Sequence, residues 1–405
     1  MKPPTFMVVA GEASGDALAA ELVEALRREW TRRCAHGTAD AQPLRTALAP
    51  RFFGAGGPRM AAAGVELAFD LTRHSVIGLS EAVRQALKFR RLLHQLLRLA
   101  RERQPDALIC VDFHGFNGRL AAAVRRLARR RRGMFNNWNP RIVQFVSPQV
   151  WASRPGRAFQ MAETLDLLLT IFPFEPAWYA ARVPELRVEF VGHPLVGRYA
   201  GEAVRPLEPG PRHLLLLPGS RADEVRRHLP LLLETARRIA AARPQSRFMA
   251  VAPEASLAEE LRAGLAALGN AAVVQVGGIS AALRGAELAI SKTGTVLMEC
   301  AFFGVPAVTF YKTSWPTYWV GRRIIQVKWL SMPNILADAP LFPEFVQAEA
   351  TAENLSRAAL ALLNDPARQA VVRGQLAEVV RSLGPPGAPE RAARLIADLL
   401  DGTLR

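Results

Sequence analysis

The stretch from Leu214 to Val225 constrains the fold of this chain more than any other segment. It reads Leu-Leu-Leu-Leu-Pro-Gly-Ser-Arg-Ala-Asp-Glu-Val, which is an apolar run, a tight turn and the start of a long helical pattern. A buried strand that leads directly into a helix is the repeating unit of α/β proteins. Such a turn presents unpaired backbone N–H groups and the positive end of a helix dipole to an anion.

Three residues of this turn have the properties of a phosphate site. Gly219 lets the backbone come close to a ligand, and Ser220 can cap the helix or donate a hydrogen bond. Arg221 adds a guanidinium whose fork matches a phosphate group. An ordinary strand-to-helix turn with a solvated arginine would show the same residues, so the turn alone leaves both interpretations open.

Length and composition limit the remaining choices. The chain has 405 residues, more than one typical core, so two domains are expected. Its net charge of +16 indicates an anionic partner, which could be nucleic acid, an acidic lipid surface or a phosphorylated substrate. Three cysteines without metal-ligand spacing favour a reducing cytoplasm. No signal peptide is apparent, and no stretch approaches the ~18 apolar residues of a spanning helix, so any membrane contact should be peripheral.

Strands and helices alternate along both halves of the chain. We expect strands at 5–10, 52–58 (ending in a glycine turn), 107–111, 142–146, 167–172 and 188–191, and then at 213–217, 248–252, 273–276, 288–291 and 308–311. A polar, proline-rich segment at 196–212 separates the halves, and 31–50 and 133–140 look like inserted loops. The pattern predicts an α/β fold with two Rossmann-like domains and a cleft between them. The expected domains are 1–200 and 201–365, with helices at 366–405 that pack back across them.

The first half carries acidic and histidine side chains where its strands end. The loop from Gly11 to Asp16 lacks the glycine spacing of a dinucleotide fingerprint, and its acids suit sugar hydroxyls better than phosphate. One of Ser14 and Asp16 is expected simply to cap the helix. Asp112 and His114 follow a buried strand, so both are candidates for a general base.

The second half contains another helix start at the expected ligand edge. Thr293, Gly294 and Thr295 open a helix that carries Glu299 about one turn inside. Anion-binding turns therefore gather in the second half, and acids and histidines in the first. This division suits a nucleotide donor held by one domain and an acceptor presented by the other.

One amphipathic stretch, residues 76–103, alternates apolar side chains with cations at helical spacing. This pattern fits an interfacial helix on anionic lipid. It also fits the commoner case of an amphipathic helix packed on a sheet. The candidate lipid-docking residues are Val76, Ile77, Leu79, Val83, Arg84, Leu87, Lys88 and Arg91.

Eight motifs in order, spread from Val8 to about Gln347, resemble the lipid-A-disaccharide synthases, a family of glycosyltransferases with two Rossmann domains of the GT-B type. The motifs are Ala-Gly-Glu-Ala-Ser-Gly-Asp at 10–16, Phe-Gly-Ala-Gly-Gly-Pro-Arg-Met at 53–60, Val-Ser-Pro-Gln-Val-Trp-Ala at 146–152, Phe-Pro-Phe-Glu at 172–175, Val-Gly-His-Pro-Leu at 191–195, Leu-Pro-Gly-Ser-Arg at 217–221, Thr-Gly-Thr at 293–295 with Glu299, and Pro-Asn-Ile-Leu at 333–336.

The resemblance implies a specific reaction. It is the transfer of 2,3-diacylglucosamine from UDP to the 6-hydroxyl of 2,3-diacylglucosamine 1-phosphate, with inversion, to give the β-1′,6-linked lipid A precursor. The family uses no metal and no cofactor and works on the cytoplasmic face of the inner membrane. No Asp-x-Asp occurs in the chain, which agrees with a diphosphate that is not clamped by Mg²⁺.

The resemblance also assigns roles to residues. Asp112 matches the family's proposed base, and Arg221 would neutralise the departing diphosphate together with the two helix starts. His193 could assist at the cleft or could be a structural histidine before Pro194. The donor side would comprise Gly219, Ser220, Arg221, Thr293, Gly294, Thr295, Glu299, Asn334 and Gln347, and the acceptor side Glu12, Ser14, Asp16 and His193.

Both implied substrates carry acyl chains, so the stretch at 76–103 becomes the preferred contact with an anionic inner-membrane surface. Ser153 stands where the family usually shows a second Trp, and Lys292 adds a cation beside the donor turn. Whether the chain forms a homodimer stays open.

Two other functions remain as alternatives to that of a lipid-A-disaccharide synthase. The first is another UDP-sugar enzyme of the same architecture, such as a soluble-acceptor glycosyltransferase or a UDP-sugar 2-epimerase. The second is a nucleic-acid-binding protein, which is disfavoured because the chain has only four tyrosines and its aromatic residues fall mostly in apolar runs.

Overall fold

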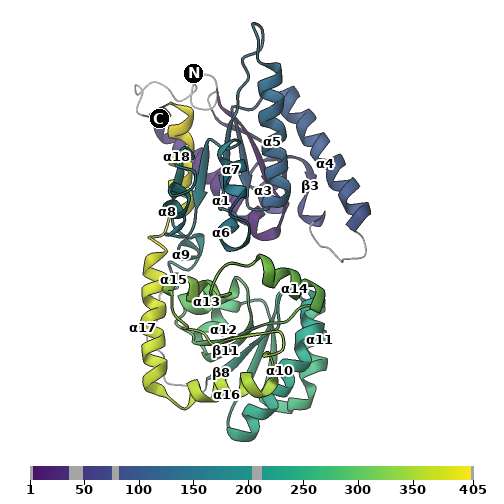
Figure 1. Cartoon of the computed structure of the whole chain (residues 1–405), viewed down its shortest axis with the longest axis vertical. Helices are drawn as coiled ribbons and strands as arrows, with labels where there is room; N and C mark the ends of the chain where they lie inside the picture. The colour runs from purple at the N-terminus through teal and green to yellow at the C-terminus, as the bar shows by residue number, and fades with distance from the viewer. Residues whose placement is uncertain (1–2, 36–48, 75–81, 203–211, 403–405) are drawn as a thin grey trace. The chain divides into compact units, whose positions relative to one another are not determined.

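The computed structural model describes residues 3–35, 49–74, 82–202 and 212–402, which form two α/β units (Figure 1). Unit 1 comprises residues 1–198 and 383–405, and unit 2 comprises residues 199–382. Each unit has its own parallel sheet and its own apolar cores. The predicted fold class, two Rossmann-like domains, is confirmed.

The sheet of unit 1 has seven parallel strands in the order β3-β2-β1-β4-β5-β6-β7. Phe6 in β1 is in register with Phe52 of β2 on one side and with Ala107 of β4 on the other. The strand order therefore reverses between β1 and β4, which is where open parallel sheets bind ligands. The strands are β1 (Thr5–Ala10), β2 (Arg51–Gly56), β3 (Glu66–Asp70), β4 (Ala107–Val111), β5 (Arg141–Phe145), β6 (Leu167–Thr170) and β7 (Val188–Phe190).

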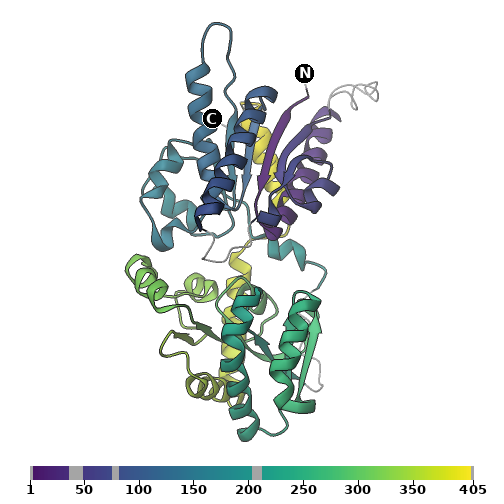
Figure 2. The same ribbon diagram turned by 90° about the vertical axis from the view of Figure 1, so that its right-hand side faces the viewer.

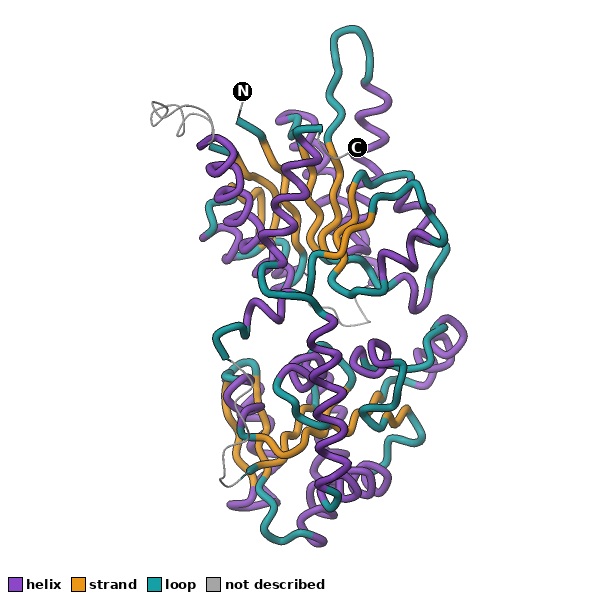
Figure 3. The backbone as a smooth tube through the Cα atoms, turned by 90° about the vertical axis from the view of Figure 1, so that its left-hand side faces the viewer, coloured by secondary structure: helices purple, strands orange, loops and turns teal. Residues whose placement is uncertain are grey.

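Helices cover both faces of this sheet, because alternate residues of its strands point to opposite sides (Figures 2 and 3). Phe6 and Val8 face a core shared with α1 and α18, whereas Met7 and Val9 face a core shared with α4 and α5. The helices are α1 (Ala13–Ala35), α3 (Pro58–Ala62), α4 (Ala82–Arg103), α5 (His114–Arg131), α6 (Val150–Ser153), α7 (Arg157–Ala162), α8 (Glu175–Ala180), α9 (Pro194–Arg198) and α18 (Ala388–Leu400).

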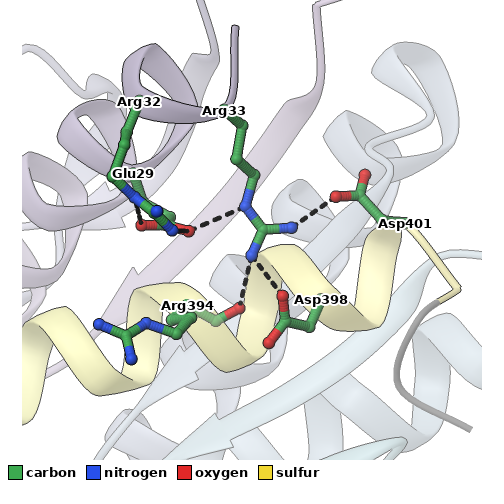
Figure 4. A network of polar contacts seen from close by, with 6 residues as sticks. All are labelled: Glu29, Arg32, Arg33, Arg394, Asp398 and Asp401. Atoms are coloured by element: carbon green, nitrogen blue, oxygen red, sulfur yellow. Dashed lines mark hydrogen bonds and ion pairs between the residues drawn. The ribbon is translucent and has the colours of Figure 1, made fainter. Parts of the chain in front are cut away.

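The last helix, α18, returns to unit 1 and packs along α1. Arg33 of α1 anchors it by hydrogen bonds to the carboxylates of Asp398 and Asp401 and to the carbonyl oxygen of Arg394, while Glu29 holds the same guanidinium from the α1 side (Figure 4). The expected block of helices at 366–405 is thus divided, since α17 (Pro366–Ser382) belongs to unit 2 and packs on α13 (Val296–Phe302).

The sheet of unit 2 has six parallel strands in the order β10-β9-β8-β11-β12-β13, so its strand order reverses between β8 and β11. One apolar core joins this sheet to α10, α11 and α16. The strands are β8 (His213–Leu217), β9 (Phe248–Ala252), β10 (Ala272–Val276), β11 (Ala286–Lys292), β12 (Ala307–Tyr311) and β13 (Glu344–Val346). The other helices are α10 (Ala222–Ala242), α11 (Ala255–Leu265), α12 (Ile279–Arg284), α14 (Trp315–Ile324), α15 (Met332–Ala337) and α16 (Ala352–Leu363).

The sequence pattern missed the short elements at the sheet margins. The edge strands β3 and β13 are only five and three residues long and none of their residues is fully buried, so they lack the apolar run that marks a central strand. The helices α14 and α15 were also not predicted. Within the described ranges, no helix is both long and apolar enough to cross a membrane.

Candidate active site at the carboxyl edges of the two sheets

The first loop of unit 1 touches the loop that follows β4, at the point where the strand order reverses. A Cβ atom on Gly11 would lie 2.1 Å from Cδ1 of Phe113, and one on Gly15 would lie 3.7 Å from Cβ of Asp112. Gly11 is therefore needed because only a residue without a side chain leaves room for the Phe113 ring. The two loops together place Asp112 at the edge of the sheet where a ligand is expected.

The backbone around Asp112 is held in an unusual conformation. Asp112 and Phe113 both have positive φ, 50° and 44°, which is rare for residues with side chains. The Asp112 carbonyl accepts hydrogen bonds from Nδ2 of Asn117 (2.9 Å) and Nε2 of Gln144 (3.2 Å), and its N–H donates to the Phe145 carbonyl (2.8 Å). Strain maintained by buried partners is characteristic of functional sites.

Asn117 and Gln144 were not singled out by the sequence reasoning. Both are buried, and Asn117 also donates to the carbonyl oxygens of Val9 and Val111, which ties β1 to β4 at the reversal point. The sequence did contain a signal for Gln144, because a glutamine within the otherwise apolar strand Arg-Ile-Val-Gln-Phe needs a hydrogen-bond partner when it is buried.

Burial changes the acid–base properties of the two candidate bases. It raises the pKa of the Asp112 carboxyl, an effect that a hydrogen bond from the Phe113 backbone partly opposes. Burial, and then the charge of Arg157, lower the pKa of His114. The Nδ1 atom of His114 is enclosed and has no hydrogen-bond partner in the part of the chain that the structure describes. A carboxylate with a raised pKa is a better proton acceptor than an ordinary aspartate.

The predicted acceptor residues of the first loop occupy different environments. Glu12 directly precedes α1 and Ser14 is exposed in its first turn. Asp16, in contrast, is only 2% exposed, and its carboxylate accepts the backbone N–H groups of Gly57 (2.7 Å), Arg59 (3.0 Å) and Met60 (3.1 Å). Asp16 thus caps the start of α3 rather than its own helix, and this geometry favours a structural role over acceptor binding.

His193 lies in a compact corner of unit 1. The ring atom Nδ1 of His193 accepts a hydrogen bond from the Leu195 backbone N–H (3.1 Å), and the backbone N–H of His193 donates to the Leu383 carbonyl (2.9 Å). The centroid of the His193 ring lies 5.5 Å from that of Phe172. Burial, and then Arg198, lower the pKa of His193 to about 4, so the ring is neutral at pH 7. Of the two readings that the sequence left open, these contacts favour the structural one.

In unit 2, the turn after β8 is organised by Glu224, which the sequence reasoning did not single out. Its Oε2 accepts the Ser220 N–H (3.1 Å) and its Oε1 accepts Nζ of Lys292 (3.0 Å). Burial raises the pKa of Glu224, but the contact with Lys292 outweighs this effect and the pKa is lowered overall. A glutamate at the third position of a helix commonly reaches back in this way, which is the signal that could have identified it.

The geometry of the same turn leaves Arg221 available to a ligand. Gly219 has φ 129°, a conformation that favours glycine, and Arg221 is exposed as the residue that precedes α10. Because the Ser220 N–H is occupied by Glu224 in this structure, a phosphate would compete with that carboxylate there. Arg221 belongs to this turn, and Lys292 reaches it through its ion pair with Glu224.

The second predicted helix start follows β11, next to β8. Thr293 bonds through Oγ1 to Oγ1 of Thr309 (3.0 Å), while Gly294 and Thr295 are exposed before α13, a helix of seven residues. Glu299 lies in α13, where its Oε1 accepts a hydrogen bond from the hydroxyl of Tyr199 (2.8 Å). Tyr199 was missed by the sequence reasoning.

The side-chain amides of Asn334 and Gln347 both bond to backbone groups of unit 2. Asn334 is 0% exposed and forms hydrogen bonds with both the N–H and the carbonyl of Phe342 (both 2.8 Å) and with Glu344 (2.9 Å). These bonds engage both polar atoms of the side-chain amide, and the predicted contact with a donor nucleotide stays a prediction. The buried amide of Gln347 pairs with the backbone N–H and carbonyl of Thr313 (3.1 and 2.9 Å) beside a pocket of about 640 Å³.

A buried histidine connects two of these loops. His228 of α10 is 2% exposed, and its ring nitrogens lie 2.7 Å from the Pro218 carbonyl oxygen and 3.1 Å from the Lys312 carbonyl oxygen. It therefore joins the turn after β8 to the loop after β12. The sequence feature that could have identified His228 is its position on the apolar face of α10. Among the described residues, no three His, Cys, Asp or Glu side chains gather as a metal site would require.

The candidate lipid-docking helix is only partly described. Val76, Ile77 and Leu79 lie outside the described residues, and Val83 and Arg84 are in the first turn of α4. Leu87 is 54% exposed, and Lys88 and Arg91 are exposed as well. Further along the helix, Leu96 and Ala100 are buried in the sheet core. The described side chains of α4 are therefore exposed from Leu87 to Arg91 with the exception of Phe89, whereas Leu96 and Ala100 pack on the sheet.

Two α/β units, each with its candidate residues at the reversal point of a parallel sheet, define the GT-B architecture of two-domain, sugar-nucleotide-dependent glycosyltransferases. Solved structures with this fold include a putative UDP-N-acetylglucosamine 2-epimerase from Listeria monocytogenes (TM-score 0.62, 14% identity, covering 100% of this chain and 98% of that one). MurG from Acinetobacter baumannii is also similar (TM-score 0.56, 14% identity, covering 98% and 99%). At these identities the likeness concerns the fold alone.

Comparison of sequences defines the family. Residues 6–392 match the sequence model of the family described as lipid-A-disaccharide synthetase. The lipid-A-disaccharide synthases of Geobacter metallireducens and Myxococcus xanthus are both 34% identical to this chain, over 97% of both sequences for the first and 98% of both for the second. The chain belongs to the lipid-A-disaccharide synthetase family, and the resemblance noted from its motifs is confirmed.

Proposed function

We propose that this chain transfers 2,3-diacylglucosamine from UDP to the 6-hydroxyl of 2,3-diacylglucosamine 1-phosphate, which forms the β-1′,6-linked lipid A disaccharide precursor and UDP. Family membership over residues 6–392 supports the reaction. The observation that carries the mechanism is the half-buried Asp112 carboxylate, with its raised pKa, on a strained turn at the reversal point of the unit 1 sheet.

In this proposal Asp112 is the general base. Its carboxylate takes the proton of the acceptor 6-hydroxyl while that oxygen attacks the anomeric carbon of the donor sugar. The bond between the anomeric carbon and the diphosphate oxygen breaks from the opposite side, so the configuration inverts and UDP leaves with the electron pair. The two amides of Asn117 and Gln144 hold the Asp112 backbone, which keeps the carboxylate in place without touching the substrate.

Unit 2 would hold the donor. Arg221 and Lys292 provide positive charge beside the turn after β8, where the developing charge on UDP needs stabilisation. Glu299, with Tyr199 bonded to it, provides a carboxylate that could accept ribose hydroxyls. Gly219 and the exposed Gly294 and Thr295 would let the donor approach the main chain at the same edge of the sheet.

The experiment that tests the function is a transfer assay with UDP-2,3-diacylglucosamine and the diacylglucosamine 1-phosphate acceptor, run with EDTA present. Disaccharide and UDP appearing in equal amounts would support the reaction and its independence of metal. A folded protein that forms no disaccharide, yet converts a UDP-sugar without any lipid acceptor, would instead point to the 2-epimerase alternative. The second result would mean that the chain shares the fold of lipid-A-disaccharide synthases but not their reaction.

Arg221→Ala should weaken UDP binding about tenfold or more and slow the transfer, because a charge-assisted hydrogen bond to phosphate contributes roughly 1.5–3 kcal/mol. Isothermal titration with UDP measures the first effect, and initial rates measure the second. Arg237→Ala is the matched control, since Arg237 is exposed on the same helix but far along it from the turn. Equal UDP affinity in the two variants would remove Arg221 from the donor site.

We also propose that the enzyme works at the cytoplasmic face of the inner membrane, with the start of α4 against anionic lipid. The triple variant Arg84→Gln, Lys88→Gln and Arg91→Gln should then bind vesicles that contain phosphatidylglycerol about 100-fold less tightly, at about 1 kcal/mol per cation. Cosedimentation measures this. The control removes three cations from the exposed surface of α5, namely Arg119, Arg126 and Arg130. Equal losses in both variants would mean that net charge, not α4, is responsible.

A further inference from the structure

Unit 2 carries an aromatic helix that the proposed function does not use. None of the residues of α14 is buried, although the helix is rich in large apolar side chains. Trp315 is 53% exposed, Trp319 52% and Val320 58%. Figure 2 shows this helix, in light green, projecting from the rest of its unit. Large exposed aromatic side chains gathered on one short element mark an interaction surface.

The rings and cations of this helix are arranged on one side. Trp315, Trp319 and Arg322 are spaced four and three residues apart, so they share a face. Tyr318 packs against both tryptophans, with ring centroids 5.8 and 5.7 Å apart, and the Arg322 guanidinium lies over the Trp319 ring at 5.9 Å. Just beyond the helix, Lys328 lies over the ring of Trp329 at 5.1 Å.

This segment is basic, and the first acid after it, Asp338, pairs with Lys328 (Nζ to Oδ1 3.9 Å). From Lys312 to Ala337 the chain contains four Lys or Arg residues and no Asp or Glu, as well as three of its seven tryptophans. Tryptophan and tyrosine side by side with cations are typical of elements that lie at the level of lipid headgroups. There the rings sit among headgroups and acyl chains while the cations meet anionic phosphates.

The position of the helix within unit 2 agrees with this chemistry. It follows the carboxyl end of β12, which lies beside β11 and therefore on the same edge of the sheet as Lys292 and Thr293. Met134 and Phe135 of unit 1 are also large, apolar and exposed, but they do not lie at the ligand edge of their sheet. They connect the end of α5 to the start of β5 and so lie at the amino edge of their sheet, away from Asp112.

Charge also argues against the other surfaces that could cover this helix. The whole chain has a net charge of +16. A second copy of the chain would therefore have little electrostatic complementarity to α14, which is basic and contains no acid. An anionic bilayer offers negative charge over any extent of contact. It also accepts the exposed rings without requiring a matching pocket.

We infer that α14, with the segment up to Trp329, is a second lipid-docking element, which places the ligand edge of unit 2 against an anionic membrane surface. This inference rests on the proposed lipid-linked function but concerns a different element from α4. The helix needs no bound substrate for this contact.

The test uses the full chain and vesicles of phosphatidylethanolamine and phosphatidylglycerol. Arg322→Gln with Arg323→Gln should weaken vesicle binding about 30-fold, at about 1 kcal/mol per cation, and Trp319→Ser with Val320→Ser should weaken it at least about tenfold. The matched control is Arg368→Gln with Val371→Ser, an exposed cation and an exposed valine on α17 of the same unit, which should bind as the unaltered chain does.

A fluorescence measurement provides an independent readout. Acyl chains that carry bromine should quench the tryptophan emission of the vesicle-bound chain, and Trp319→Phe should remove part of that quenching while it keeps most of the binding. Unchanged vesicle binding in both α14 variants, with circular dichroism as in the unaltered chain, would overturn the inference. So would a change in sedimentation behaviour without any change in vesicle binding, because the face would then belong to a second copy.

The outcomes separate this inference from the proposed function. Transfer measured with acyl-shortened, water-soluble substrates does not depend on vesicle binding, so the α14 variants should keep it. Loss of vesicle binding with intact soluble transfer supports the docking role. Absence of transfer in the unaltered chain would refute the proposed reaction, whereas the vesicle comparison between the α14 variants and the α17 control would still decide about the helix.

Discussion

Asp112→Asn should reduce turnover by at least about 100-fold while UDP binds with unchanged affinity, because a positioned general base contributes roughly 10²–10⁴ to the rate. The amide has the same shape as the carboxylate but cannot accept the proton of the acceptor hydroxyl. Steady-state rates and UDP titration together test this. Asp106→Asn is the control, since Asp106 lies just before the amino end of the same strand, where its carboxylate accepts the Thr5 backbone N–H.

The same variant should change the pH dependence of the reaction. The base works only when it is deprotonated, and burial raises the pKa of Asp112, so kcat/KM should fall as the pH is lowered through that raised value. Asp112→Asn should remove this acidic limb from whatever activity remains. A variant with reduced turnover but an intact acidic limb would assign the base to another group, and His114 would be examined next.

Asp16→Ala should strongly lower the stability of unit 1. It would leave the N–H groups of Gly57, Arg59 and Met60 without their carboxylate partner. An unsatisfied buried donor costs about 1–3 kcal/mol, and since such costs are not fully additive we expect a loss of about 3–5 kcal/mol. Urea unfolding, followed by a probe in unit 1, measures the loss.

The specific activity of the variant decides between the two roles of Asp16. If the carboxylate only supports α3, the fraction of Asp16→Ala that remains folded at low temperature should turn over within about threefold of the unaltered chain. Glu12→Gln, a change in the same loop outside that network, should leave stability unaltered and serves as the control. Normal stability with abolished transfer would restore Asp16 to the acceptor site as the sequence predicted.

Much of the fold could be predicted from local patterns. Apolar runs such as Thr5–Ala10 and His213–Leu217 are buried on both faces, so they are recognisable as central strands of a parallel sheet. Each is followed by a turn and a helix, and this alternation alone predicts a doubly wound unit. The short edge strand β13 escaped notice because its three residues are half-buried and follow no such pattern.

The candidate site could be predicted only in part. Asp112 was identified because it directly follows a strand, and Arg221 because it closes the turn after one. The topology of parallel sheets brings strand ends to a common edge. The partners that hold the site, Asn117, Gln144 and Glu224, come from distant or neighbouring elements. Whether such a polar side chain supports the backbone or faces a ligand depends on which carbonyl or N–H group lies opposite.

The fold class, the family and the strand ends that carry the candidate chemistry could all be predicted from local sequence, because they depend on periodicity and on short motifs in a fixed order. Which partners each polar group has could be seen only in the folded chain. Asp16 and Asn334 share motifs with candidate ligand residues, yet both are enclosed and bonded to backbone groups from other segments. Burial and partners depend on long-range packing, which a motif does not contain.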